Sequence, residues 1–169
     1  RHPQLKLKMW LKGIMTKCNH STFGELTLSL ESDPLEVLRM GTYVGSCFSL
    51  GGGYDYSAAA TAMDINKQVI YARTKKGTVV ARQALALSEK LKLVCFSVYP
   101  LGADKELKNA FSDYDRKFAK SLDLPLYLPD DEGDEDNENT YEIARIISSD
   151  WYDDLAWMPK AKASSSKRK

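Results

Sequence analysis

Residues 68–98, QVIYARTKKGTVVARQALALSEKLKLVCFSV, decide the fold of this chain. Aliphatic, β-branched and aromatic residues fill three runs at 68–73, 78–88 and 91–98, and only short polar gaps separate them. Apolar runs joined by tight turns, the first of which contains Gly77, predict an antiparallel meander of three strands. The third run is almost continuously apolar, so we expect a central strand that is covered on both faces.

The elements on either side of this meander alternate between strand and helix patterns. Residues 25–31 alternate in polarity like a half-buried strand, and Asp33 followed by Pro34 is typical of a helix start. The alanine-rich residues 54–63 predict a closely packed helix. After the meander, residues 104–122 predict an amphipathic helix whose apolar stripe recurs every three or four positions. That stripe consists of Leu107, Phe111, Tyr114, Phe118 and Leu122.

These patterns predict one mixed α/β (α+β) domain, built on a mostly antiparallel sheet with the meander at its centre and helices on its flanks. We expect the domain to span residues 25–159, with a solvated acidic loop at 129–140 and closing strands within 141–157. A basic segment, residues 1–24, precedes it, and residues 5–15 within that segment predict a short amphipathic helix that packs on its own domain. Residues 160–169 are expected to form a disordered basic tail.

Composition excludes several classes of function. The formal net charge is only +1, so no strong field favours nucleic acid or a membrane surface. No apolar run approaches the roughly 20 residues that a membrane span requires. The three cysteines, an odd and widely spaced set, predict reduced thiols rather than a disulfide framework. We therefore expect a cytoplasmic protein without a membrane span.

Common catalytic and metal-binding motifs are missing from the sequence. It has no Walker loop, no HExxH and no paired CxxC, so no metal is expected. Cys47 precedes a run of three glycines and could act as a nucleophile near a helix start. No base lies near Cys47 in sequence, so a packed cysteine is the alternative interpretation, and Cys95 in the third strand predicts a core residue.

Three short stretches resemble the GNAT superfamily of N-acyltransferases, as does the order of the predicted elements. Residues 74–81, TKKGTVVA, look like the hairpin that carries a glycine before a strand of small residues. Residues 94–100, VCFSVYP, look like the fourth strand of that fold, which often ends in Val-x-Pro. Residues 118–125, FAKSLDLP, are similar to the end of its central helix. The resemblance implies a mixed sheet that is splayed at its fourth strand.

The same resemblance implies an acyl-CoA site at the end of the fourth strand. There, backbone amides at the N-terminus of the next helix would hold the pyrophosphate of acetyl-CoA or another acyl-CoA. The positions that match are Val98, Tyr99, Pro100, Leu101, Gly102, Ala103 and Lys105. The loop departs from the family pattern, because it is shorter and carries an acid, Asp104, near the expected phosphate site.

The implied activity is acyl transfer from acyl-CoA to the amine of a small molecule or a protein. Tyr152 and Asp153 are the candidates for moving protons, since a tyrosine often protonates the leaving thiolate in this superfamily. Two alternatives remain open. The chain could be a non-catalytic, acyltransferase-like module of a larger protein that binds a protein partner, or it could be a cysteine-dependent enzyme that uses Cys47.

Overall fold

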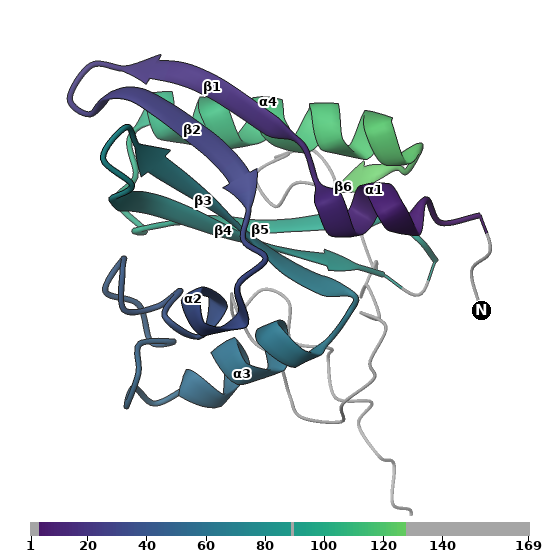
Figure 1. Cartoon of the computed structure of the whole chain (residues 1–169), viewed down its shortest axis with the longest axis horizontal. Helices are drawn as coiled ribbons and strands as arrows, with labels where there is room; N and C mark the ends of the chain where they lie inside the picture. The colour runs from purple at the N-terminus through teal and green to yellow at the C-terminus, as the bar shows by residue number, and fades with distance from the viewer. Residues whose placement is uncertain (1–3, 89, 128–169) are drawn as a thin grey trace, which may run out of the picture.

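The computed structural model describes residues 4–88 and 90–127, which form a six-stranded sheet with helices on both faces (Figure 1). The strands lie in the order β1-β2-β3-β4-β5-β6, so neighbours in the sheet are also consecutive along the chain. Their bounds are β1 Met15–His20, β2 Gly24–Leu30, β3 Lys67–Thr74, β4 Val79–Leu87, β5 Leu93–Tyr99 and β6 Leu126–Tyr127. The helices are α1 Leu7–Lys12, α2 Pro34–Leu38, α3 Asp55–Met63 and α4 Lys105–Leu122.

The predicted meander is confirmed as β3, β4 and β5, which pair antiparallel. β5 is interior to the sheet, and its side chains alternate between two apolar cores as the sequence predicts. Up to Tyr127, the last described residue, β6 pairs with β5 in parallel at Leu93 with Leu126 and at Val94 with Tyr127. The fold class predicted from the sequence, mixed α/β with a mostly antiparallel sheet, is therefore confirmed.

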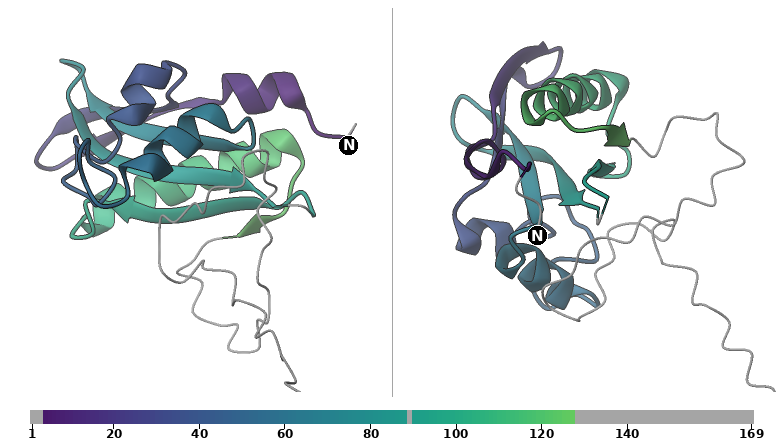
Figure 2. Two further views of the ribbon diagram at one scale, coloured as in Figure 1. Left: turned by 90° about the horizontal axis from the view of Figure 1, so that it is seen from below. Right: turned by 90° about the vertical axis from the view of Figure 1, so that its right-hand side faces the viewer.

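The two faces of the sheet carry different helices, as two further views show (Figure 2). α4 covers one face through the predicted stripe, of which Phe111, Tyr114 and Phe118 are fully buried. α2 and α3 cover the other face, where Val37, Ala58 and Ala60 pack against β3, β4 and β5. Alanines let α3 lie close to the strands, which explains why this helix is so rich in them.

Residues before Glu25 contribute more to the sheet than their sequence suggests. The sequence predicts no strand there, yet β1 is an edge strand paired with β2 over its whole length. α1 is fixed by Trp10, which is fully buried, stacks on Phe118 and donates from Nε1 to the carbonyl of Ile65 at 2.7 Å. Leu7 and Leu11, by contrast, are 46% and 52% exposed, so only part of the expected apolar face of this helix packs on the domain.

The predicted acidic loop, closing strands and basic tail lie outside the described residues.

Candidate functional site

The site predicted from the sequence lies at the Tyr99 end of β5. The described part of β6, which ends at Tyr127, pairs with the first two residues of β5. The register with β4 changes toward the Tyr99 end, because Gln83 faces Val98 whereas Leu85 faces Cys95. β5 thus contains one extra residue, a β-bulge, just before it leads into the loop and α4. Such bulges are common next to active sites, where they redirect the strand.

The predicted acyl-CoA residues form one exposed turn after this bulge. Leu101 is 69% exposed, and Gly102 and Lys105 are also exposed. Tyr99 and Ala103 are buried, each at 8% exposure, and the Ala103 N–H donates to the Pro100 carbonyl at 2.8 Å. The outer part of the turn is therefore accessible to a ligand, while its two ends are fixed in the protein.

The N-terminus of α4 holds carboxylates of the protein itself. Asp104 Oδ1 accepts the Leu107 N–H at 2.9 Å, and Asp104 Oδ2 lies 2.9 Å from Nε2 of the buried His20. The Leu107 N–H and then the His20 side chain keep the pKa of Asp104 below its ordinary value. Glu106 also accepts the backbone N–H of Ser21 at 2.8 Å. The Asp104 carboxylate therefore already occupies part of the positive potential at the N-terminus of α4, where an anionic ligand would otherwise bind.

His20 connects the β1–β2 hairpin to this helix terminus. Its Nδ1 accepts the Thr22 N–H at 3.0 Å, so Nε2 carries the hydrogen that Asp104 accepts. Phe23 packs on the ring with a centroid distance of 4.8 Å. The hairpin and α4 are consequently joined close to the predicted acyl-CoA loop.

A buried arginine that the sequence analysis missed lies at the same end of the sheet. Arg82 of β4 is fully buried, and its guanidinium carbon lies 4.1 Å from the ring centroid of Tyr99 and 5.4 Å from that of Phe48. Its Nη2 donates to Ser46 Oγ at 3.3 Å. The sequence did contain a signal for this residue, because Arg82 is a charged residue in a strand that is otherwise rich in small and apolar residues. These contacts bring the loop between α2 and α3 to the Tyr99 end.

The three predicted catalytic residues have different outcomes. Tyr152 and Asp153 lie outside the described residues, so their roles stay predictions. Cys47 is exposed, and the expectation that it is packed was wrong. It lies between Ser46 and Phe48, which both contact Arg82. Cys95 is buried in the core as predicted.

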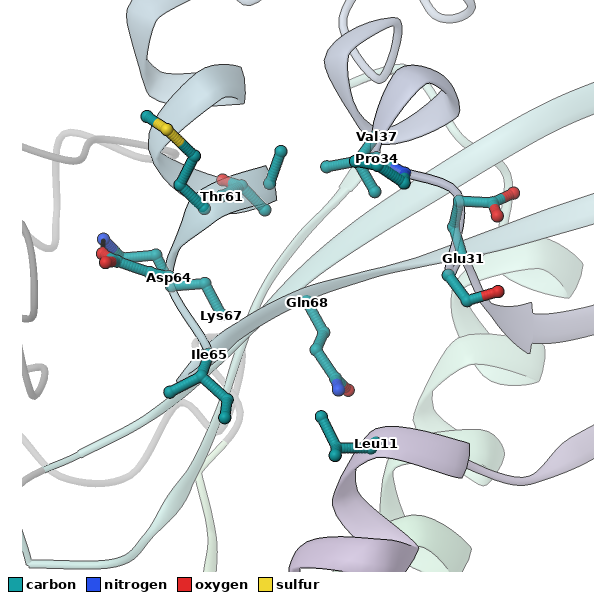
Figure 3. A pocket seen from close by; sticks show the side chains of 12 residues that line it. Leu11, Glu31, Pro34, Val37, Thr61, Asp64, Ile65, Lys67 and Gln68 are labelled. Carbon is teal, nitrogen blue, oxygen red and sulfur yellow. Dashed lines mark hydrogen bonds and ion pairs between the residues drawn. The ribbon is translucent and has the colours of Figure 1, made fainter.

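A pocket of about 380 Å³ lies elsewhere, between α1, α2, α3 and the start of β3 (Figure 3). Asp64 and Lys67 form an ion pair and extend together on one side of it, whereas Gln68 extends toward Leu11 on the other. None of the candidate catalytic or acyl-CoA-binding residues from the sequence analysis lines this pocket. Lys67 and Gln68 at the start of β3 line it, whereas Tyr71, farther along β3, pairs with Arg82 beside the predicted site, so the pocket is distinct from that site.

The described part of the chain contains neither a metal-binding cluster nor a membrane-spanning helix. Within residues 4–88 and 90–127, no three His, Cys, Asp or Glu side chains are grouped so that they could hold a metal ion. No helix within the same ranges is long and apolar enough to span a membrane.

The chain was compared with family models, curated proteins and solved structures. No family model matches the chain, and no curated protein matches it. Among solved structures, the chain is similar to a ribosomal-protein-alanine N-acetyltransferase from Brucella melitensis biovar Abortus 2308, with 18% identity and a TM-score of 0.46. The alignment covers 75% of this chain and 97% of that chain.

This similarity assigns no function at so low an identity. The order of the strands and helices in this chain is what resembles the GNAT fold. From β2 to β6 the order is strand, two helices, three antiparallel strands, a helix and a parallel strand, as the resemblance implies.

Proposed function

We propose that the protein is an acyl-CoA-dependent N-acyltransferase whose donor site is the Tyr99 end of β5. One observation carries the proposal: β5 leads through a bulge and an exposed turn into the N-terminus of α4. In open sheets, ligands commonly bind beyond the carboxyl ends of strands where neighbouring connections diverge. The proposed compartment is the cytoplasm, and Cys18, Cys47 and Cys95 are all free thiols.

The proposed reaction needs one proton to move. An amine nitrogen attacks the thioester carbonyl, a C–N bond forms, the C–S bond breaks, and the proton of the amine passes to the leaving thiolate. Tyr152 and Asp153 remain the proposed groups for this transfer. The acceptor class, a small-molecule or protein amine, is part of the proposal.

The donor phosphates need a different position from the one that the family pattern implies. Asp104 already accepts the Leu107 amide, and a second carboxylate, Glu106, lies in the same turn. We therefore propose that the phosphates contact the outer turn at Leu101 and Gly102 and the ammonium of Lys105, all of which are exposed. An exposed Lys beside a phosphate acts as a point charge, so reversing the charge at Lys105 should weaken the binding of acyl-CoA measurably.

A transfer assay with two matched variants tests this proposal. Release of the CoA thiol from acetyl-CoA is followed in the presence of primary amines. Lys105→Glu is expected to raise the KM for acetyl-CoA about tenfold, because it replaces a charged contact by repulsion. Lys117→Glu, the same change at an exposed position farther along α4, should leave KM unchanged. Equal effects of the two variants, or no thiol release with any amine, would reject this donor site.

A second candidate is favoured by the carboxylates at α4. The proposed alternative is a non-catalytic, acyltransferase-like module of a larger protein, in which Asp104, His20 and Glu106 keep the former donor site closed. That protein would contact a partner rather than acyl-CoA. This alternative predicts that acetyl-CoA does not bind, even to Asp104→Asn, which removes one negative charge. The enzyme proposal predicts instead that Asp104→Asn binds acetyl-CoA at least as tightly as the native chain.

A further inference from the structure

A group of buried polar side chains lies between α4 and the sheet, away from the exposed turn at residues 99–105. Asp115 of α4 and Cys95 of β5 are fully buried, and Gln83 of β4 is 3% exposed. Polar groups at such depth are costly unless hydrogen bonds satisfy them. Their bonding therefore indicates what holds this part of the protein together.

Gln83 connects α4 to the bulge of β5. Its Nε2 donates to Asp115 Oδ2 at 3.1 Å and to the carbonyl oxygen of Phe96 at 2.9 Å. Phe96 lies within the irregular stretch, because the register passes from Gln83 opposite Val98 to Leu85 opposite Cys95. The amide orientation is set by the Phe96 carbonyl, which can only accept a hydrogen bond, so Nε2 and not Oε1 lies against it.

Two oxygens in this group have no hydrogen-bond donor. They are Asp115 Oδ1 and Gln83 Oε1, and both are buried. If Asp115 were a carboxylate, both atoms would be unsatisfied acceptors. A carboxylic acid would supply a hydrogen for Gln83 Oε1, because an acid and a primary amide can exchange two hydrogen bonds and one of the two, from Nε2 to Oδ2, is present. The hydrogen-bonding pattern thus favours the neutral acid.

The electrostatic surroundings agree with this assignment. Burial raises the pKa of Asp115 to about 7, and hydrogen bonds from Gln83 and Cys95 offset only part of that rise. Arg116, the next residue of α4, lowers the pKa slightly by its charge. The thiol of Cys95 has its own pKa raised by burial and then by Asp115, so it stays protonated and does not act as a counter-charge. Tyr114, the preceding residue, also has a raised pKa and stays neutral.

We propose that Asp115 is a neutral carboxylic acid that donates its proton to Gln83 Oε1, and that the Asp115–Gln83 pair is a pH-sensitive device that fixes the β5 bulge. Loss of the proton places a carboxylate opposite Oε1. The bond to Oε1 is then lost and the two oxygens repel each other, so the Gln83 side chain must shift, and its bond to the Phe96 carbonyl is strained. Ionisation of one side chain on α4 is thereby coupled to the strand that leads into the 99–105 turn. This inference does not depend on the proposed function.

Nuclear magnetic resonance on the full chain tests the inference without any ligand. The Asp115 carboxyl carbon, assigned by comparison with Asp115→Asn, is expected to titrate near pH 7 rather than near 4. The backbone amides of Phe96 and Ser97 should shift with the same midpoint. In Asp115→Asn they should keep the low-pH positions throughout, and in Asp113→Asn, which changes an exposed acid on the same helix, they should titrate as in the native chain.

A midpoint near 4 for Asp115 would overturn the assignment of the proton. A midpoint near 7 with no change at Phe96 and Ser97 would overturn the coupling to the bulge.

Discussion

Asp115→Asn should stabilise the folded protein, and it should do so only above acidic pH. The pKa of Asp115 is about 7 in the folded chain against 3.8 for a free aspartate, a difference of about 3 units. Each unit corresponds to 1.36 kcal/mol, so ionising this buried acid costs the native chain about 4 kcal/mol. Between about pH 4 and pH 7 the folded state binds the proton and the unfolded state does not, so stability falls as pH rises.

An asparagine at this position cannot ionise and can keep both hydrogen bonds. Its oxygen accepts from Gln83 Nε2, and its own amide donates to Gln83 Oε1. Relaxation and water entry around a buried charge commonly reduce such a cost. The expected gain for the variant is therefore about 2 to 4 kcal/mol at pH 8 and below about 1 kcal/mol at pH 4.

Urea unfolding at several pH values between about 4 and 8 measures this difference. Asp113→Asn is the matched control, because Asp113 is exposed on the same helix, and its stability should follow the native curve. A destabilised Asp115→Asn at every pH, or a gain that does not change with pH, would refute the reasoning.

Three further predictions concern packing and exposure. Trp10→Leu should lower the free energy of unfolding by about 3 kcal/mol in urea titrations, because it removes a buried indole and its hydrogen bond. Gly41→Ala should lower the melting temperature strongly, since an added Cβ would lie 2.1 Å from a backbone carbon, whereas Gly53→Ala meets open space and should leave the melting temperature unchanged. Alkylation followed by mass spectrometry should modify Cys47 rapidly, and Cys95 only after unfolding; rapid labelling of both thiols in the folded chain would contradict the described burial.

The sequence predicted the interior of the fold better than its edge. Interior strands are recognised as nearly continuous apolar runs, because the sheet is covered on both faces, and α4 is recognised by its apolar stripe, which is buried as a whole. β1 was missed because its inward positions, Thr16, Cys18 and His20, are only weakly apolar, while Met15 is exposed, so the strand shows no clear apolar alternation. Its position depends on pairing with β2, a contact that local periodicity does not report.

The candidate site was predictable only where its residues are consecutive. The turn at residues 99–105 follows directly from a strand and precedes a helix, so its place was clear from the sequence. The contact of His20 with Asp104 joins residues 84 apart, and that of Gln83 with Asp115 joins residues 32 apart. No short motif marks either pair. Both depend on how the β1–β2 hairpin and α4 pack against the meander.

The most direct test of the proposed function is a thermal-stability titration of the full chain with acetyl-CoA and with free CoA. A ligand that binds only the folded state adds about 2.7 kcal/mol at 100 times its Kd, which raises the melting temperature by several degrees. We predict a saturable increase with both ligands that is smaller in Lys105→Glu and unchanged in Lys117→Glu. No increase at millimolar concentrations of either ligand would contradict the acyl-CoA site and favour the binding-module alternative.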